Sequence, residues 1–134
     1  MMTDLERRQA ALEKTIAKYR GRVLDFKSAD CVRMIRFHLL QMGHRPPPLP
    51  RYSSMIGARR ALRDKGGLVA ILDGLLPRIA PARMLEGDIA VVGGEGGEAG
   101  LICVGYKYMG WHQDSAESVN LIIGLGDVTA AWRA

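Results

Sequence analysis

A cysteine stands where the sequence predicts the start of a helix. In the stretch FKSADCVRMIRFHLL, which runs from Phe26 to Leu40, Ser28 or Asp30 is a typical N-cap residue and Cys31 follows closely. The positive end of a helix dipole and its unpaired N–H groups favour a thiolate, so we expect a lowered pKa for a thiol there. Two interpretations of Cys31 stay open at this stage: a nucleophile, or a small hydrophobic residue on the apolar side of the helix.

A nucleophilic cysteine needs a base within hydrogen-bonding distance, about 3 Å, and a histidine is the usual one. His38 follows Cys31 on the same predicted helix, about 10 Å further along the axis, and His44 lies beyond the helix end. His112 comes later, after a predicted strand, and reaches Cys31 only if its loop folds back. Since His38 and His44 are too far from the thiol, His112 is the alternative base.

No pattern in the sequence predicts a cofactor or a metal ion. Cys31 and Cys103 are too few for a disulfide framework or a structural zinc site, and the histidines lack the spacing of metal ligands. The glycine-rich segment 93–100, GGEGGEAG, lacks the Lys-Ser/Thr pair and the following helix of a phosphate loop. We expect it to be a hairpin turn, and we expect the protein to have no cofactor and no metal.

Four helices are predicted in the first part of the chain. The first begins with the capping box Thr3-x-x-Glu6 and ends near Tyr19, with Leu5, Leu12, Ile16 and Tyr19 on its apolar side. The second runs from the cysteine to residue 43, and the proline-rich segment 44–52 then forms a stiff connector. The third covers about 54–66, with Met55, Ala58 and Leu62 inward, and the fourth covers 68–76.

Strands are predicted in the second part. Residues 87–92 and 99–110 form two strands around the glycine-rich turn, 119–125 form a third, and 127–134 form a closing turn or short helix in which Trp132 packs onto the body. The expected fold is α+β, with N-terminal helices packed on a small antiparallel sheet. Residues 1–134 are expected to form one domain.

The charge is unevenly distributed along the chain. Residues 1–83 contain 17 Lys and Arg against 7 Asp and Glu, whereas residues 84–134 contain 2 against 7. Such polarity allows docking between proteins by complementary potential. We do not expect nucleic-acid binding, because the basic residues are scattered and few aromatic residues accompany them. No apolar run approaches the ~20 residues of a membrane-spanning helix, and the N-terminus lacks a signal-peptide core, so synthesis in a cytoplasm is expected.

The order of motifs resembles the NlpC-type branch of the papain-like cysteine peptidases. The matching residues are Asp30-Cys31 at a helix start, Gly87-Asp88 before an apolar strand, and the strand GLICVG at 100–105. More closely, the chain resembles a family of small tailed-phage and prophage proteins of unknown function related to the NlpC type. That resemblance also rests on Tyr52, on LLPRIAPAR at 75–83 and on the terminal AWR.

The resemblance implies an NlpC-like fold with Cys31 in the nucleophile position. The catalytic histidine of such peptidases opens the strand that ends at Gly105, and in this register its position is Ala99. Alanine cannot accept a proton. Ala99, Leu101 and Cys103 then share the strand face toward the cysteine helix, as an apolar seam in which a Cys31–Cys103 disulfide is conceivable but disfavoured in a reducing cytoplasm.

Two functions follow from these expectations. The first is a phage tail-tip or baseplate protein on an inactive peptidase scaffold, which is made in the bacterial cytoplasm, becomes part of the virion tail and acts by docking to other tail-tip proteins. The second is an active cysteine hydrolase of peptidoglycan peptides, with Cys31 as nucleophile and His112 or a partner's group as base.

Overall fold

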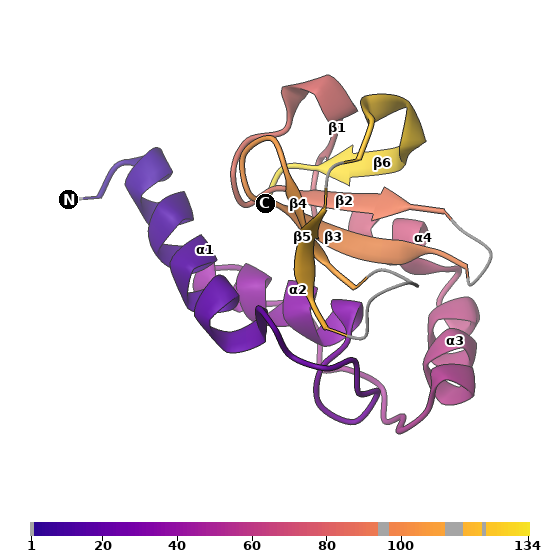
Figure 1. The fold of residues 1–134 in the computed structure, drawn as a ribbon. Helices are drawn as coiled ribbons and strands as arrows, with labels where there is room; N and C mark the ends of the chain where they lie inside the picture. The colour runs from indigo at the N-terminus through magenta and orange to yellow at the C-terminus, as the bar shows by residue number, and fades with distance from the viewer. Residues whose placement is uncertain (1, 94–96, 112–116, 122) are drawn as a thin grey trace.

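The computed structural model describes residues 2–93, 97–111, 117–121 and 123–134 (Figure 1). A six-stranded antiparallel sheet has the strand order β1-β6-β2-β3-β4-β5, and helices cover one of its faces. The helices are α1 (Asp4–Tyr19), α2 (Cys31–Gln41), α3 (Met55–Asp64) and α4 (Leu68–Asp73). The strands are β1 (Arg78–Ile79), β2 (Ile89–Val92), β3 (Ala99–Cys103), β4 (Tyr108–Gly110), β5 (Val119–Leu121) and β6 (Val128–Trp132). The predicted α+β fold is confirmed.

The first helix begins and ends as predicted. The amide of Glu6 donates to the Thr3 hydroxyl at 3.1 Å, and the amide of Thr3 donates to the Glu6 carboxylate at 3.4 Å, which completes the capping box. Leu12 and Tyr19 are buried as expected, but Leu5 is 57% exposed. The inward place in the first turns is taken by Arg8, which is 3% exposed.

The second helix starts at Cys31 because Asp30 caps it. The Asp30 carboxylate accepts the amide of Arg33 at 2.9 Å, and Gly43, with φ of 93°, turns the chain away after the helix. Its sheet-facing side consists of the buried residues Met34, Ile35, His38 and Leu39. Together with α1 and α4 they form the main core over one face of the sheet.

The third and fourth helices differ in detail from the prediction. Met55, expected to face inward, is 47% exposed, because α3 packs beside the end of the sheet and not flat upon it. The fourth helix ends at Asp73, earlier than predicted, since the chain turns at Gly74. Leu76 is nevertheless buried, and Pro77 leads into β1.

The sheet holds three strands more than the sequence indicated, and one of them is the short β1 directly after Pro77. Segment 99–110 forms two strands, β3 and β4, which turn at Gly105 with φ of 103°. Segment 127–134, predicted as a turn or short helix, contains β6, which lies inside the sheet between β1 and β2. Trp132 pairs with Ile89 in the register of β2 and β6, and its side chain is fully buried, so the predicted packing of Trp132 is confirmed.

The two faces of β3 are the reverse of the expectation. Ile102 belongs to the core under the helices, and a side chain at Gly100 would meet Ile35 of α2. Leu101 and Cys103 lie in a second, smaller cluster on the opposite face, with Ala90, Tyr108 and Val128. The prediction that Leu101 and Cys103 face the cysteine helix is therefore wrong, because the strand register places the even-numbered residues there.

Candidate functional site

Cys31 lines an open groove of about 710 Å³ between the start of α2, the helix α3 and the start of β3. We call this cavity the Cys31 groove. Its apolar lining comes from the loop before α2, from α2 and α3, and from the end of β4: Leu24, Phe26, Val32, Met55, Leu62 and Trp111. Its polar lining consists of Asp30, Tyr52, Arg59, Arg63 and Glu98. Small residues, among them Ala58, Gly67 and Ala99, leave the space open.

The thiol of Cys31 has a higher pKa than a helix start alone predicts. Burial raises its pKa, and the neighbouring Asp30 carboxylate acts in the same direction. The main-chain N–H groups of Gly100, Cys31 and Val32 favour the thiolate and lower the pKa, but they do not outweigh burial. The expected lowering of the pKa is therefore wrong, because the packing that seats this half-buried thiol at the helix end withdraws enough of it from water to favour the neutral form.

Of the three histidines, His38 is buried in the core, and both of its ring nitrogens have hydrogen-bond partners there. Its Nε2 lies 2.8 Å from the carbonyl oxygen of Gly87 and its Nδ1 lies 3.0 Å from the Thr15 hydroxyl. Burial lowers the pKa of His38 to about 4. The ring therefore joins α2 to α1 and to the start of β2, and it is not part of the groove lining. His112, the alternative base, lies outside the described residues.

Two residues at the start of β3 line the groove together with Cys31. Ala99 is one of them, so the residue to which the resemblance assigns the histidine position does lie beside this groove. Glu98 is the other, and the sequence analysis did not identify it. Side chains alternate along a strand, and Gly100 faces α2, so position 98 lies on the α2 side. The Glu98 carboxylate accepts the amide of Leu68 at 3.3 Å, at the start of α4.

A polar cluster fixes the start of the cysteine helix. The Tyr52 hydroxyl donates to the Asp30 carboxylate at 2.9 Å, and Arg33 forms an ion pair with the same carboxylate. The Arg33 guanidinium lies over the Tyr52 ring, 4.5 Å from its centroid, and donates to the carbonyl oxygen of Phe26 at 2.7 Å. Burial and the Asp30 carboxylate raise the pKa of Tyr52, so the hydroxyl remains a donor. The only sequence indication of this role was the place of Tyr52 among the resemblance motifs.

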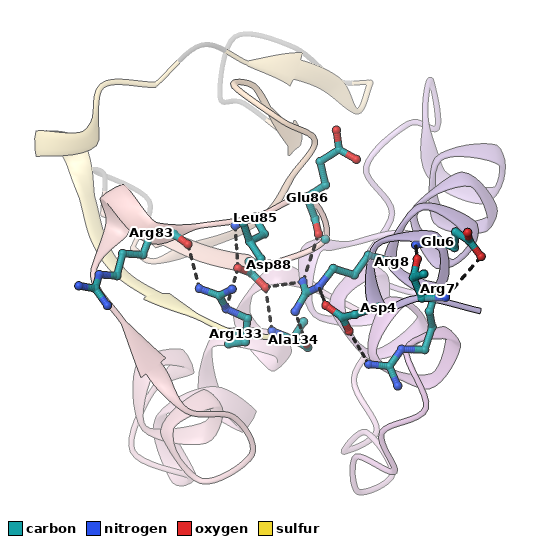
Figure 2. A network of polar contacts seen from close by, with 12 residues as sticks. Asp4, Glu6, Arg7, Arg8, Arg83, Leu85, Glu86, Asp88, Arg133 and Ala134 are labelled. Carbon is teal, nitrogen blue, oxygen red and sulfur yellow. Dashed lines mark hydrogen bonds and ion pairs between the residues drawn. The ribbon is translucent and has the colours of Figure 1, made fainter. Parts of the chain in front are cut away.

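The Gly87-Asp88 motif and the terminal AWR belong to one structural network away from the groove lining (Figure 2). Asp88 is fully buried, and one of its oxygens accepts from Arg8 at 2.8 Å and from the amide of Ala134 at 3.0 Å. Its other oxygen accepts the amide of Leu85 at 2.8 Å and pairs with Arg133 at 3.3 Å. One carboxylate thus joins three segments that are distant in sequence: helix α1, the loop before β2 and the C-terminal residues.

The two cysteines are separate and both are free. The Cys103 thiol donates to the carbonyl oxygen of Gly105 at 3.0 Å, on the sheet face opposite the helices. Within the described part of the chain, no group of three or more His, Cys, Asp or Glu side chains is arranged to hold a metal ion. In the same residues no helix has the length and apolar character needed to cross a membrane.

This arrangement is similar to a solved structure. The P60 domain of the antigen MAP1272c from M. avium paratuberculosis has a TM-score of 0.58 with this chain at 13% sequence identity. The similarity covers 96% of both chains, so the two proteins share a fold.

The sequence itself places the chain in a family without an assigned role. No curated protein matches it. The family model of the domain of unknown function DUF6950 matches residues 3–134, nearly the whole chain, and the protein belongs to this family.

Proposed function

We propose that this protein is a phage tail component that uses an NlpC/P60-like fold for binding and does not hydrolyse peptides. One observation carries the proposal of inactivity. Among the residues that the structure describes, none lining the Cys31 groove is a histidine, and the start of β3 offers Glu98 and Ala99 beside the cysteine. A thiol whose pKa is raised by burial is a poor nucleophile at neutral pH unless a base takes its proton.

The tail assignment is supported by the resemblance to small tailed-phage and prophage proteins. In this proposal the protein is made in the cytoplasm of the bacterial host, joins the tail-tip or baseplate region and remains in the virion. Its partners are other tail-tip proteins. The open groove beside Cys31 is the surface best shaped for such a partner, because both apolar and charged side chains line it.

A second function, peptidoglycan hydrolysis with Cys31 as nucleophile, is favoured by one specific feature. The thiol lines an open groove at the N-terminus of α2, with the amides of Gly100 and Val32 acting on it. This is the position that a nucleophile and its oxyanion-stabilising donors require. His112 or a group from a partner protein would supply the base.

Two experiments test these functions. For the tail assignment, virions are induced from a lysogen whose prophage encodes this chain and are analysed by mass spectrometry after gradient purification. We expect the protein in intact particles at a fixed ratio to the tail proteins. Its absence from particles and from tail-assembly intermediates contradicts the assignment.

For inactivity, purified protein and its Cys31→Ser variant are incubated with peptidoglycan, and released peptides and new amino groups are measured. We expect no release above the buffer control with either protein. Release by the unmodified protein that Cys31→Ser abolishes establishes the hydrolase instead.

A further inference from the structure

Helix α3 presents uncompensated positive charge to the Cys31 groove. Arg59 and Arg63 lie one turn apart, both line the groove and both are exposed. In the described part of the chain neither forms an ion pair or a hydrogen bond with a carboxylate. Like charges at this spacing repel each other along a helix, so a ligand carboxylate between them would relieve an unfavourable interaction.

The acidic residues of the groove do not neutralise these arginines. Asp30 is 2% exposed, and its carboxylate already accepts from Tyr52 and from Arg33. The Glu98 carboxylate accepts the amide that begins α4. The carboxylates of Asp30 and Glu98 are therefore already hydrogen-bonded within the protein, while the guanidinium groups of Arg59 and Arg63 remain available to an incoming anion.

Apolar side chains lie on the same helix and across the groove. Met55 is 47% exposed and Leu24 is 39% exposed, although both line the cavity. Leu62 and Trp111 add partly buried apolar surface. A ligand that matches this lining carries a carboxylate next to an apolar side chain.

We infer that the Cys31 groove binds an extended acidic segment of a partner protein, in which carboxylates pair with Arg59 and Arg63 on α3 and the apolar side chains between them contact Leu24 and Trp111, which line the groove from other elements. The inference rests on the proposed function, since it names the chemistry of the partner that docks there. Successive side chains of an extended chain point to opposite sides. In a segment of alternating acidic and aliphatic residues, the acidic side chains can therefore face the arginines while the aliphatic side chains face the apolar lining.

Binding is measured by fluorescence anisotropy with two labelled heptapeptides. The probe has the sequence Ala-Glu-Leu-Glu-Leu-Glu-Ala, and its control replaces every Glu by Gln. We expect the Glu peptide to bind at least about tenfold more tightly than the Gln peptide, with affinity that falls as salt is added. Equal affinity for the two peptides, or binding of neither, overturns the inference.

The helix provides a matched control for the arginines. Arg59→Glu combined with Arg63→Glu reverses the charge in the groove, whereas Arg60→Glu changes an exposed arginine of the same helix that does not line it. We expect the double variant to lose at least about tenfold in affinity for the Glu peptide and Arg60→Glu to remain within about threefold. Circular dichroism confirms that both variants fold. Equal losses in the two variants overturn the assignment of this groove.

Two further measurements separate this inference from the proposed function. If the protein is present in virions and Arg59→Glu with Arg63→Glu is incorporated normally, the groove assignment fails while the tail assignment stands. If the protein is absent from virions but the Glu peptide binds as described, the tail assignment fails and the ligand chemistry stands. Tighter binding of soluble peptidoglycan fragments than of the Glu peptide overturns the choice of a protein partner.

Discussion

The guanidinium of Arg8 and the carboxylate of Asp88 meet at 2.8 Å inside the protein, although 80 positions separate them in sequence (Figure 2). Arg8 also donates to main-chain oxygens of Glu86 at 3.2 Å and Ala134 at 2.9 Å. Nearly every donor of this buried guanidinium has an acceptor. The pair therefore fastens α1 to the start of β2 and to the end of β6.

Removing Arg8 is predicted to destabilise the fold strongly. Arg8→Ala leaves the Asp88 carboxylate without its main buried counter-charge, and breaking such a pair costs about 3–5 kcal/mol in the free energy of unfolding. Arg7→Ala is the matched control, because Arg7 pairs with Asp4 on the surface and such pairs contribute at most ~1 kcal/mol. Urea unfolding measures both values. A loss below about 1 kcal/mol for Arg8→Ala would contradict the role given to this pair.

Acid is predicted to weaken the protein through His38. Its pKa in the folded state is about 4, against 6.5 for an ordinary histidine, so the folded state holds the neutral ring. Above pH 6.5 both states are neutral. Below that pH the unfolded chain gains a proton first, and stability falls until about pH 4, by about 3 kcal/mol in total.

The His38 contribution is isolated by comparing variants. Urea unfolding of the unmodified protein and of His38→Gln is measured between pH 7 and pH 4. We expect His38→Gln to be less stable at pH 7 and to lose less stability on acidification. His44→Gln controls for loss of an imidazole elsewhere. An unchanged pH dependence in His38→Gln would show that other groups cause the acid sensitivity.

Cys31 is predicted to react slowly with alkylating agents at neutral pH. Burial raises the pKa of its thiol above the ordinary value, so less than the few per cent of thiolate found in a free cysteine is present at pH 7. Modification by iodoacetamide is followed by peptide mass spectrometry, which distinguishes Cys31 from Cys103. We expect the rate to keep rising beyond pH 9. A plateau below pH 7 would reveal a stabilised thiolate and favour the hydrolase.

A methyl group at Gly100 is predicted to disturb the contact between β3 and α2. A Cβ atom there would lie 2.4 Å from the Cδ1 atom of Ile35, closer than two carbon atoms can pack. We expect Gly100→Ala to cost about 1–3 kcal/mol in unfolding free energy. Gly126→Ala is the control, because nothing lies within 4 Å of its added Cβ.

The same clash predicts a rescue. Ile35→Val removes the Cδ1 atom, and alone it costs about 0.5–1.5 kcal/mol. In the double variant the valine leaves room for the methyl at position 100, so the two losses should be less than additive. Losses that add fully in thermal or urea unfolding would mean that Gly100 is needed for a reason other than this contact.

Local interactions were read correctly from the sequence. The capping box of Thr3 and Glu6, the start of α2 directly after Asp30 and the glycine that follows its end are all settled by residues a few positions apart. The residues of the Cys31 groove were predictable from the sequence only in part. Cys31 at a helix start was predictable, and so was its neighbour Asp30, but Tyr52, whose hydroxyl donates to Asp30, comes from the end of the proline-rich connector 44–52.

Only the tertiary structure decided the rest, since those features depend on distant pairing. Val128–Trp132 contains two alanines and reads weakly as a strand, yet it pairs on both sides with β1 and β2. The register of β3 fixed which of its residues face α2, and burial reversed the pKa shift expected at Cys31. The sequence by itself determined where helices begin and which thiol stands at one of them. Packing determined what surrounds that thiol, because burial and strand register arise from contacts that no local pattern encodes.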